Sequence, residues 1–478
     1  MNVLLVASEM APYAKTGGLG DVVGALPKHL RRLGHDVRVV MPLFASIDTS
    51  KVTFVPVGAP FDVVLGAHRY TVRIFASEQD PQNFFVHCPA VYDRGSLYTN
   101  DPDEHRRFLV LCHAAMMAAQ RMQFKVDILH CNDWQTALMP LMLKVRYAWD
   151  RLFAQTKTLL SIHNLNYQGT FPASVLPETQ LADAAHLFHQ DQLHHPQGGR
   201  INFMLHGLLY ADGINTVSPT YAKEIQTPEH GAGLDPFLRA RKSTVVGILN
   251  GVDYDEWSPE LDRHIAFRYS ADTLDLKEKN KEVLLGKMGL PYVPGVPLVG
   301  IVSRLTSQKG FDLLGPVLPD LMKRRTFQLV VLGNGESGLE QMFSHFQRHF
   351  PQRVSFYRGF SNPLAHMIEA GADIFCMPSR YEPCGLNQMY SLRYGTVPVV
   401  HKTGGLADTV EPWHPATRTG TGFLFEHHDG TGLRWALNAA LDAYRDKPRW
   451  RQLMLNGMSR DFSLDKQAKL YELVYERL

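Results

Sequence analysis

Residues 290–305 read LPYVPGVPLVGIVSRL, and this stretch decides how many sheets the chain contains. Its first half is rich in Pro and Gly, a composition typical of turns and linkers. The apolar run that follows, Pro297 to Val302, has the length and composition of a buried strand. Because a complete series of such runs already precedes residue 250, this strand starts a second sheet. The sequence therefore predicts a domain boundary between residues 250 and 297.

Short apolar runs alternate with longer helical patterns along the whole chain, which is typical of βαβ units in a parallel sheet. In the first half, the expected strands are 3–7, 36–41, 128–130, 158–162 and 213–217. In the second half, they are 297–302, 328–332, 354–357, 374–377 and 397–400. We therefore predict an α/β protein with two Rossmann-like, doubly wound parallel-sheet domains.

The composition is that of an ordinary globular protein, with 45% hydrophobic and 20% charged residues among 478. Forty-nine Lys and Arg balance 47 Asp and Glu, so the formal charge of +2 predicts neither a nucleic-acid nor a membrane partner. The five cysteines lack the paired spacing of disulfide frameworks or zinc sites. The first basic residue is Lys15, so we expect no secretion signal and a cytoplasmic location.

One glycine turn occurs twice: KTGGLGD at residues 15–21 returns as KTGGLAD at residues 402–408, each time between a strand and a helical run. Paired glycines let backbone amides approach an anion, and the following helix N-terminus adds a positive dipole end. A tight turn without a ligand is the alternative, but the duplication favours binding. Neither turn matches a P-loop or a dinucleotide fingerprint. Two such turns, facing across a cleft, would enclose one bipartite ligand.

Two further loops follow strands of the second half. The loop SRLTSQKGFD, 303–312, carries Arg304 and Lys309, two cations suited to a diphosphate, although a solvated loop is the alternative. The loop PSRYEPCGLNQ, 378–388, holds Glu382 between apolar and cyclic neighbours. Glu382 could also be a helix cap, and Cys384 a small buried residue.

The run Glu382-Pro383-Cys384-Gly385-Leu386-Asn387-Gln388, followed by Thr403-Gly404-Gly405-Leu406, resembles the glycogen synthase/starch synthase family. Further matching motifs cover nearly the whole chain: Lys15 to Leu19, His130 to Trp134, Ile162 to Asn164, Val217 to Ala222, Asn250 to Asp253 and the Arg304/Lys309 loop. The resemblance implies a GT-B glycosyltransferase that moves glucose from ADP-glucose to the non-reducing end of an α-1,4-glucan such as glycogen, with retention of configuration. It implies an N-terminal domain over residues 1–250, a nucleotide-sugar domain over 251–462, and a C-terminal helix, 463–478, that crosses back.

The resemblance also implies residue roles. The expected catalytic set is His163, Arg304, Lys309 and Glu382. His163 would lie near the anomeric carbon, the two cations at the diphosphate, and Glu382 at the glucose hydroxyls. The expected substrate-binding set is Lys15, Gly18, Asp21, Tyr98, Asp133, Asn250, Cys384, Gly385, Thr403, Gly404 and Gly405. Thr403, Gly404 and Gly405 would bind the diphosphate through backbone amides. Trp134 is either an acceptor platform or a core residue.

Two positions depart from related patterns. Many retaining GT-B enzymes have a second Glu eight residues after the first, where this chain has Tyr390, as the family does. His206 stands where the family more often has Lys. The cluster His186, His189, His194 and His195 lacks completing ligands, so we expect a solvated loop, no metal and no cofactor. The rival functions are a phosphorylase or another GT-B transferase, and a glucan-binding regulator without activity.

Overall fold

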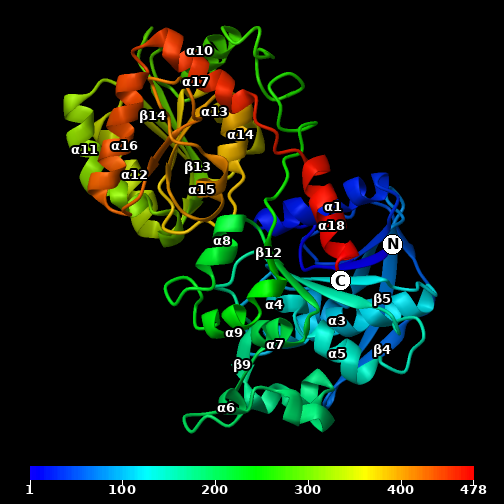
Figure 1. Cartoon of the computed structure of the whole chain (residues 1–478). Coiled ribbons are helices and arrows are strands. Elements are labelled where there is room, and N and C mark those ends of the chain that lie inside the picture. The colour runs from blue at the N-terminus through cyan, green and yellow to red at the C-terminus, as the bar shows by residue number, and fades with distance from the viewer. The chain divides into compact units, whose positions relative to one another are not determined.

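The computed structural model describes all 478 residues, and the chain folds into two compact units (Figure 1). Unit 1 comprises Met1–Val217, Ala222–Gly251 and Leu464–Leu478, and unit 2 comprises Ser218–Tyr221 and Val252–Ser463. None of the helices is long and apolar enough to cross a lipid bilayer. Both units are α/β and doubly wound around a mainly parallel sheet.

Residues 218–221 belong to unit 2, although they lie within the range expected for the first domain. Their hydrogen bonds give the reason. The Ser218 hydroxyl donates to the carbonyl of Pro383 at 2.7 Å. The backbone N–H and the hydroxyl of Thr220 each donate to a carboxylate oxygen of Asp408, both at 2.7 Å.

The sheet of unit 1 has ten strands, in the order β12-β11-β8-β7-β1-β2-β6-β5-β3, with β4 paired to β5. Strands β12 to β6 in this order are parallel, and β5, β3 and β4 add an antiparallel edge. The strands are β1 (Asn2–Val6), β2 (Asp36–Pro42), β3 (Phe54–Pro56), β4 (Phe61–Leu65), β5 (His68–Ser77), β6 (Asn83–His87), β7 (Ile128–Asn132), β8 (Lys157–Ile162), β11 (Gly213–Thr216) and β12 (Val245–Gly247), with a separate pair β9 (Thr170–Pro172) and β10 (Arg200–Asn202).

The helices of unit 1 form where apolar residues recur at helical spacing. In α1 (Gly18–Arg32), Leu19, Val22, Val23, Leu26 and Leu30 form one buried face. The other helices are α2 (Pro89–Tyr92), α3 (Glu104–Arg121), α4 (Asp133–Thr136), α5 (Met139–Arg146), α6 (Gln190–Leu193), α7 (Phe203–Tyr210), α8 (Pro219–Glu224, which unit 2 shares), α9 (Asp235–Ala240) and α18 (Leu464–Glu476).

Helix α18 is tied to the unit 1 sheet by a buried chain of hydrogen bonds. The Tyr475 hydroxyl donates to His130 Nδ1 at 2.8 Å, and His130 Nε2 donates to the Ser161 hydroxyl at 2.5 Å. Ser161 in turn donates to Asn215 Oδ1, and Asn215 Nδ2 donates to the Tyr471 hydroxyl at 3.0 Å. Burial lowers the pKa of His130 to about 3, so its ring is neutral and can accept at Nδ1. The last helix of the chain is therefore part of the core of unit 1.

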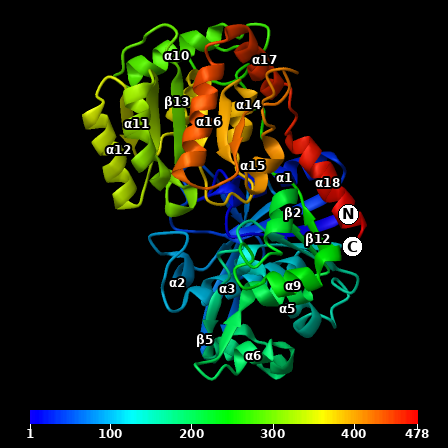
Figure 2. The same cartoon turned by 60° about the vertical axis from the view of Figure 1, so that its left-hand side comes forward.

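The sheet of unit 2 has six parallel strands, in the order β15-β14-β13-β16-β17-β18, which is the Rossmann strand order. The strands are β13 (Leu298–Leu305), β14 (Gln328–Gly335), β15 (Val354–Arg358), β16 (Ile374–Met377), β17 (Val397–His401) and β18 (Phe423–Phe425). Its helices are α10 (Leu276–Lys287), α11 (Leu314–Arg324), α12 (Ser337–His349), α13 (Asn362–Gly371), α14 (Asn387–Arg393), α15 (Gly404–Thr409), α16 (Gly430–Ala443) and α17 (Lys447–Met458), which surround the sheet (Figure 2).

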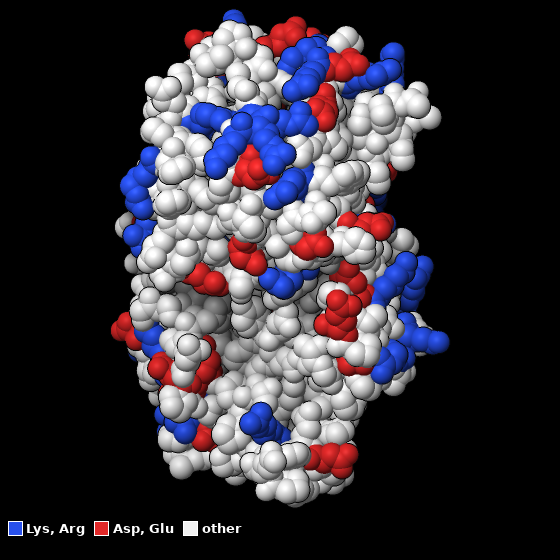
Figure 3. Space-filling model, turned by 90° about the vertical axis from the view of Figure 1, so that its left-hand side faces the viewer, with Lys and Arg blue, Asp and Glu red and all other residues white.

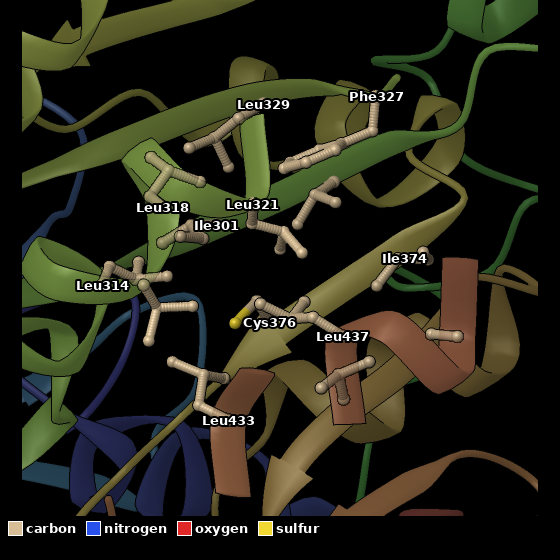
Figure 4. Close-up of a cluster of buried hydrophobic side chains, with 14 of the residues drawn as sticks. Ile301, Leu314, Leu318, Leu321, Phe327, Leu329, Ile374, Cys376, Leu433 and Leu437 are labelled. Atoms are coloured by element: carbon tan, nitrogen blue, oxygen red, sulfur yellow. The ribbon is translucent and has the colours of Figure 1, made fainter. Parts of the chain in front are cut away.

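The two faces of the unit 2 sheet bury alternate residues of each strand. On β13, Val299 and Ile301 point into one core, whereas Leu298 belongs to the other. The first core packs β13, β14 and β16 against α11, α12 and α16, with Ile301, Cys376 and Leu437 among its members (Figure 4). The second core packs the opposite face against α10 and α13. Burial on both faces explains why these strands are continuous apolar runs in the sequence.

Tyr475→Phe tests the role of the hydrogen-bonded chain under α18. The substitution keeps the ring but leaves buried His130 Nδ1 without a donor, so we expect a loss of about 1–3 kcal/mol in the free energy of unfolding. Urea denaturation followed by circular dichroism measures this loss. Tyr147→Phe is the matched control, because Tyr147 is also buried in unit 1 but its hydroxyl makes no hydrogen bond. Equal losses in the two variants would contradict the assignment.

Candidate active site

The predicted site residues of unit 2 lie at the switch point of its sheet. Strands β13 and β16 are neighbours, and the chain leaves them toward opposite sides of the sheet. Open α/β sheets bind ligands outside the carboxyl ends of strands at this point. The loop after β13 carries Arg304 and Lys309, and the loop after β16 carries Glu382. The fold thus brings together three residues that lie up to 78 positions apart in the sequence (382 − 304 = 78).

Lys309 and Glu382 form an ion pair. The Lys309 ammonium donates to Glu382 Oε2 at 2.7 Å, and the Ser379 hydroxyl donates to the same oxygen at 2.9 Å. The side chain of Glu382 is 6% exposed and that of Lys309 is 17% exposed. The other carboxylate oxygen, Oε1, accepts no hydrogen bond from the protein. The pair therefore holds a fixed carboxylate with one oxygen left for a ligand hydroxyl.

Arg304 is exposed, and its guanidinium makes no hydrogen bond and no ion pair. It lies next to the last residue of β13, opposite Asn334 of β14. A planar guanidinium without a protein partner can bind two oxygens of a phosphate in a fork. Of the two predicted diphosphate cations in unit 2, Arg304 alone has no carboxylate partner.

Two loops of the site pack backbone against backbone, which requires glycine. A Cβ atom on Gly404 would lie 2.0 Å from the carbonyl oxygen of Glu382, and one on Gly405 would lie 2.0 Å from that of Cys384. The φ angle of Gly404 is also positive, +44°. The second glycine turn is thus needed to hold the Glu382 loop, whatever ligand it binds.

The backbone amides of Thr403 and Gly405 make hydrogen bonds within the protein. The N–H of Gly405 donates to the carbonyl of Glu382 at 3.0 Å, and the N–H of Thr403 donates to that of His401 at 3.0 Å. The first of these bonds joins the glycine turn to the Glu382 loop, and the second lies at the end of β17.

Gln388 is a residue of this site that sequence reasoning missed. Its side-chain amide donates to the carbonyls of Cys384 and Gly385, both at 3.0 Å, and to the Thr409 hydroxyl at 3.1 Å. Gly385 has a φ of +72°, and a Cβ there would lie 2.5 Å from Gln388 Oε1. Cys384 is buried. The hydrogen bonds from Gln388 therefore hold the Cys384-Gly385 segment in place.

In unit 1, the first glycine turn is organised by a buried carboxylate, Glu9. Glu9 accepts from the N–H and the hydroxyl of Thr16 at 2.6 and 2.7 Å, and from the N–H of Gly17 at 3.3 Å. The Tyr98 hydroxyl donates to Glu9 at 2.6 Å. Glu9 is not among the site residues predicted from the sequence. Its only signal there is its position shortly after the first strand, β1. The structure thus places Tyr98 as a support of the glycine turn.

The turn carries Lys15, whose ammonium contacts Asp21 of α1 at 2.5 Å while the side chain remains 46% exposed. Gly18 opens α1, and a Cβ added to it would lie 4.0 Å from the side-chain amide of Asn250. Asn250 is buried, with Gln467 of α18 at 3.5 Å. The predicted residues Lys15, Gly18, Asp21 and Asn250 therefore gather around the start of α1.

A second group in unit 1 joins the ends of β7 and β8. The Asp133 carboxylate accepts from the backbone N–H of His163 at 2.7 Å, and burial raises the pKa of this carboxyl to about 7. Asp133 has a φ of +54°, a strained conformation of the kind found at functional sites. His163 Nε2 donates to Asn132 Oδ1 at 2.9 Å, whereas Nδ1 is buried without a partner.

Burial lowers the pKa of His163 to about 4, so the ring is neutral at physiological pH. The Asn132 side-chain amide donates to the carbonyl of Val6 at 3.1 Å, which turns its Oδ1 toward His163. The proton of the ring is therefore on Nε2, and Nδ1 offers a lone pair. His163 can accept a hydrogen bond but does not carry a positive charge for a leaving group.

The structure shows the surroundings of Trp134, which the sequence left open, and of Tyr390. Trp134 is a core residue, because it is buried and contacts Phe108 and Phe203 with ring centroids at 5.1 and 6.3 Å. Tyr390 stacks on Trp257 at 3.9 Å, so an aromatic contact occupies the position of the second Glu.

His206 is buried in α7, where Nδ1 donates to the carbonyl of Asn202 at 2.7 Å and Nε2 accepts from the N–H of His189 at 3.1 Å. A neutral imidazole can do both, and burial lowers the pKa of His206 to about 4. His189 of the histidine cluster thus joins the segment to α7 through its backbone. No group of three or more His, Cys, Asp or Glu side chains in the chain has the geometry of a metal site.

Comparison with known proteins agrees with this architecture. Residues 2–240 match the family model of the starch synthase catalytic domain, and residues 292–452 match that of group 1 glycosyl transferases. Glycogen synthases of Koribacter versatilis and Thermotoga maritima are 44% and 41% identical to the chain, each over 100% of it and over 98% and 99% of the relative.

Two solved structures are also similar. The catalytic domain of starch synthase IV from Arabidopsis thaliana, bound to ADP and acarbose, has a TM-score of 0.92 and 34% identity, and covers 100% of this chain and 99% of that one. A sucrose-phosphate synthase from Thermosynechococcus elongatus shares the fold at a TM-score of 0.63 and 17% identity.

The matches to curated relatives extend over the full length of the chain, and the two units carry the expected folds. The chain therefore belongs to the glycogen synthase/starch synthase family of GT-B glycosyltransferases.

Proposed function

We propose that this protein transfers glucose from ADP-glucose to the non-reducing end of an α-1,4-glucan, with retention of configuration. The observation that carries the proposal is the set of groups at the switch point of unit 2. An unpaired guanidinium, Arg304, lies on the strand next to a fixed Lys309–Glu382 pair. The likeness to a starch synthase bound to ADP and acarbose supports a nucleoside diphosphate and a glucan as ligands.

Departure of ADP places negative charge on the leaving phosphate, and the protein must stabilise it. Arg304 supplies a full charge with planar donors, and Lys309 supplies a second one in a fixed position. Because Lys309 is already oriented by Glu382, little reorganisation is needed when the diphosphate charge develops. Groups preorganised in this way often lower the activation barrier more than any other part of an active site.

Glu382 acts on the sugar rather than on the phosphate. Its Oε2 is occupied by Lys309 and Ser379, and its Oε1 is available to accept from a glucose hydroxyl. Transfer on the same face, assisted by the leaving phosphate, then needs no second carboxylate of the double-displacement kind. In unit 1, His163 is neutral and can accept from a sugar hydroxyl, and Asp133 holds its backbone.

The donor and the activity are tested together by product release. With glycogen present, we expect release of ADP from ADP-glucose to exceed release of UDP from UDP-glucose by at least about ten-fold, as nucleotide discrimination through direct contacts allows. Coupled assays measure both products. Binding of glucan without release of either nucleotide would instead support the inactive regulator.

Lys309→Ala tests the contribution of the ion pair to both catalysis and stability. Loss of the ammonium should reduce kcat by about 100-fold or more, as removal of one preorganised donor does. It should also cost about 1–3 kcal/mol of unfolding free energy, because buried Glu382 loses its charge partner.

The double variant Lys309→Ala/Glu382→Gln is the matched comparison. It removes the unpaired charge, so we expect it to regain most of the lost stability while its kcat stays low. Chemical denaturation and initial rates of ADP release measure the two effects. Recovery of activity together with stability would show that the pair is only structural.

Glu9→Gln tests the support of the Lys15 turn. A carboxylate only accepts hydrogen bonds. The side-chain N–H₂ of Gln would instead point at one of the N–H or O–H groups that now donate to Glu9. We expect the turn to loosen and kcat/KM for ADP-glucose to fall about ten-fold, the cost of a small displacement of positioned groups. Glu78→Gln, at an exposed position of unit 1 without side-chain partners, is the control and should leave kcat/KM unchanged. Equal rates in both variants would refute the role of Glu9.

A further inference from the structure

Unit 2 contains a basic cavity that the proposed transfer reaction does not use. Its volume is about 400 Å³, within the range of small-molecule sites, and its polar lining includes Arg324, Arg325, Arg445 and Lys447. The apolar part of the lining includes Leu441 and the aromatic Tyr444. No Asp or Glu side chain lines the cavity. On the face of the molecule shown in Figure 3, Lys and Arg side chains gather in the upper part.

This cavity lies at the edge of the sheet opposite to the proposed catalytic groups. Val296 and Pro297 of the lining precede β13, and Thr326 precedes β14, so the cavity is at the amino ends of these strands. Arg304 is near the carboxyl end of β13, seven residues beyond Pro297, which is about 20 Å along an extended strand. A ligand in the cavity is therefore separate from the donor nucleotide.

The charges around the cavity are only partly balanced. Arg325 binds both carboxylate oxygens of Asp442, at 2.7 and 3.0 Å, and Arg324 donates to Asp320 at 2.9 Å. Arg445, in contrast, reaches Asp442 only at 3.9 Å, and that carboxylate is already bound by Arg325. The two carboxylates offset at most two of the four cations, so an excess of positive charge remains.

Lys447 is the lining cation that makes no ion pair. Its ammonium lies 3.0 Å from the centre of the Tyr444 ring. Burial is the main cause that lowers the pKa of Lys447, whereas the Asp373 carboxylate raises it and the buried Lys281 ammonium lowers it. Behind the Tyr444 ring, Lys281 is paired to Asp373 at 2.7 Å and contacts the Tyr444 hydroxyl at 3.2 Å. An anion beside Lys447 would supply the missing counter-charge.

We propose that this cavity binds a small metabolite that bears phosphate, with two or more negative charges. Two neighbouring cations, Arg445 and Lys447, provide a planar fork and a compact point charge, the combination suited to phosphate oxygens. The wall formed by Leu441 and Val296 gives room for the carbon part of a phosphate ester. Inorganic phosphate and a phosphorylated sugar share the anionic chemistry, and they differ in whether they contact this wall.

Isothermal titration calorimetry with inorganic pyrophosphate tests the site. The full chain is first saturated with ADP, so that the nucleotide site is filled. We expect one further equivalent of pyrophosphate to bind, and its affinity to fall about ten-fold or more in Arg445→Gln/Lys447→Gln, as for the loss of two charge-assisted contacts. Lys323→Gln is the matched control, because it removes one exposed charge of α11 outside the cavity and should change the affinity less than two-fold, about as screened surface charges do.

Both altered side chains of the double variant belong to exposed residues, so the fold should persist, and thermal unfolding without ligand checks this. The pyrophosphate-induced rise in Tm gives a second measure of binding in each variant. Tighter binding of a hexose phosphate than of inorganic phosphate would assign the ester, and equal binding would assign the free anion. Absence of binding at millimolar pyrophosphate, or an unchanged affinity in the double variant, would overturn the proposal.

Discussion

The proposed catalytic groups of unit 2 depend on one steric constraint, the close approach of loop backbones at the carboxyl edge of the sheet. Gly310, Gly404 and Gly405 each lie so close to a neighbouring carbonyl that a Cβ would stand 2.0 Å from its oxygen. Gly310 allows the Lys309 loop to touch Pro378, and the other two allow the turn after β17 to touch the Glu382 loop. Any side chain at these positions would push the loops apart, and the 2.7 Å contact between Lys309 and Glu382 would be lost with them.

The repeated KTGG sequence shows how one local motif can be used in two ways. In unit 2, the turn receives the carbonyl of Glu382 on the N–H of Gly405. In unit 1, the corresponding turn receives the carboxylate of Glu9 on Thr16 and Gly17. Both turns offer amides to an oxygen, as paired glycines predict. In each case, the oxygen that accepts from these amides belongs to a residue of the same unit.

The sequence predicts the parallel core of each sheet well and its margins poorly. All ten expected strands have counterparts, because strands buried on both faces form continuous apolar runs. The antiparallel edge, β3 to β5, is not predicted, since alternate residues of β4 and β5 are exposed and interrupt such runs. Strand β18, with three residues, is too short to show a period. At the site, motifs locate Arg304, Lys309 and Glu382, but not Glu9 or Gln388, whose partners are set by the tertiary fold.

Charge pairing also changes how the predicted cations can act. Lys15 and Lys309 are paired with Asp21 and Glu382 before any ligand is present, and Arg304 is not. A pair in which the carboxylate is buried keeps its ammonium in one position, and the carboxylate supplies the charge that makes burial of the cation tolerable. Under the proposed function, a diphosphate would meet Lys309 as part of a nearly neutral unit, whereas it would meet Arg304 as a full charge. In the proposed reaction, Arg304 would then contribute most to the attraction of the ground-state diphosphate, while Lys309 would contribute more as charge develops on the leaving oxygen, where a fixed position matters most.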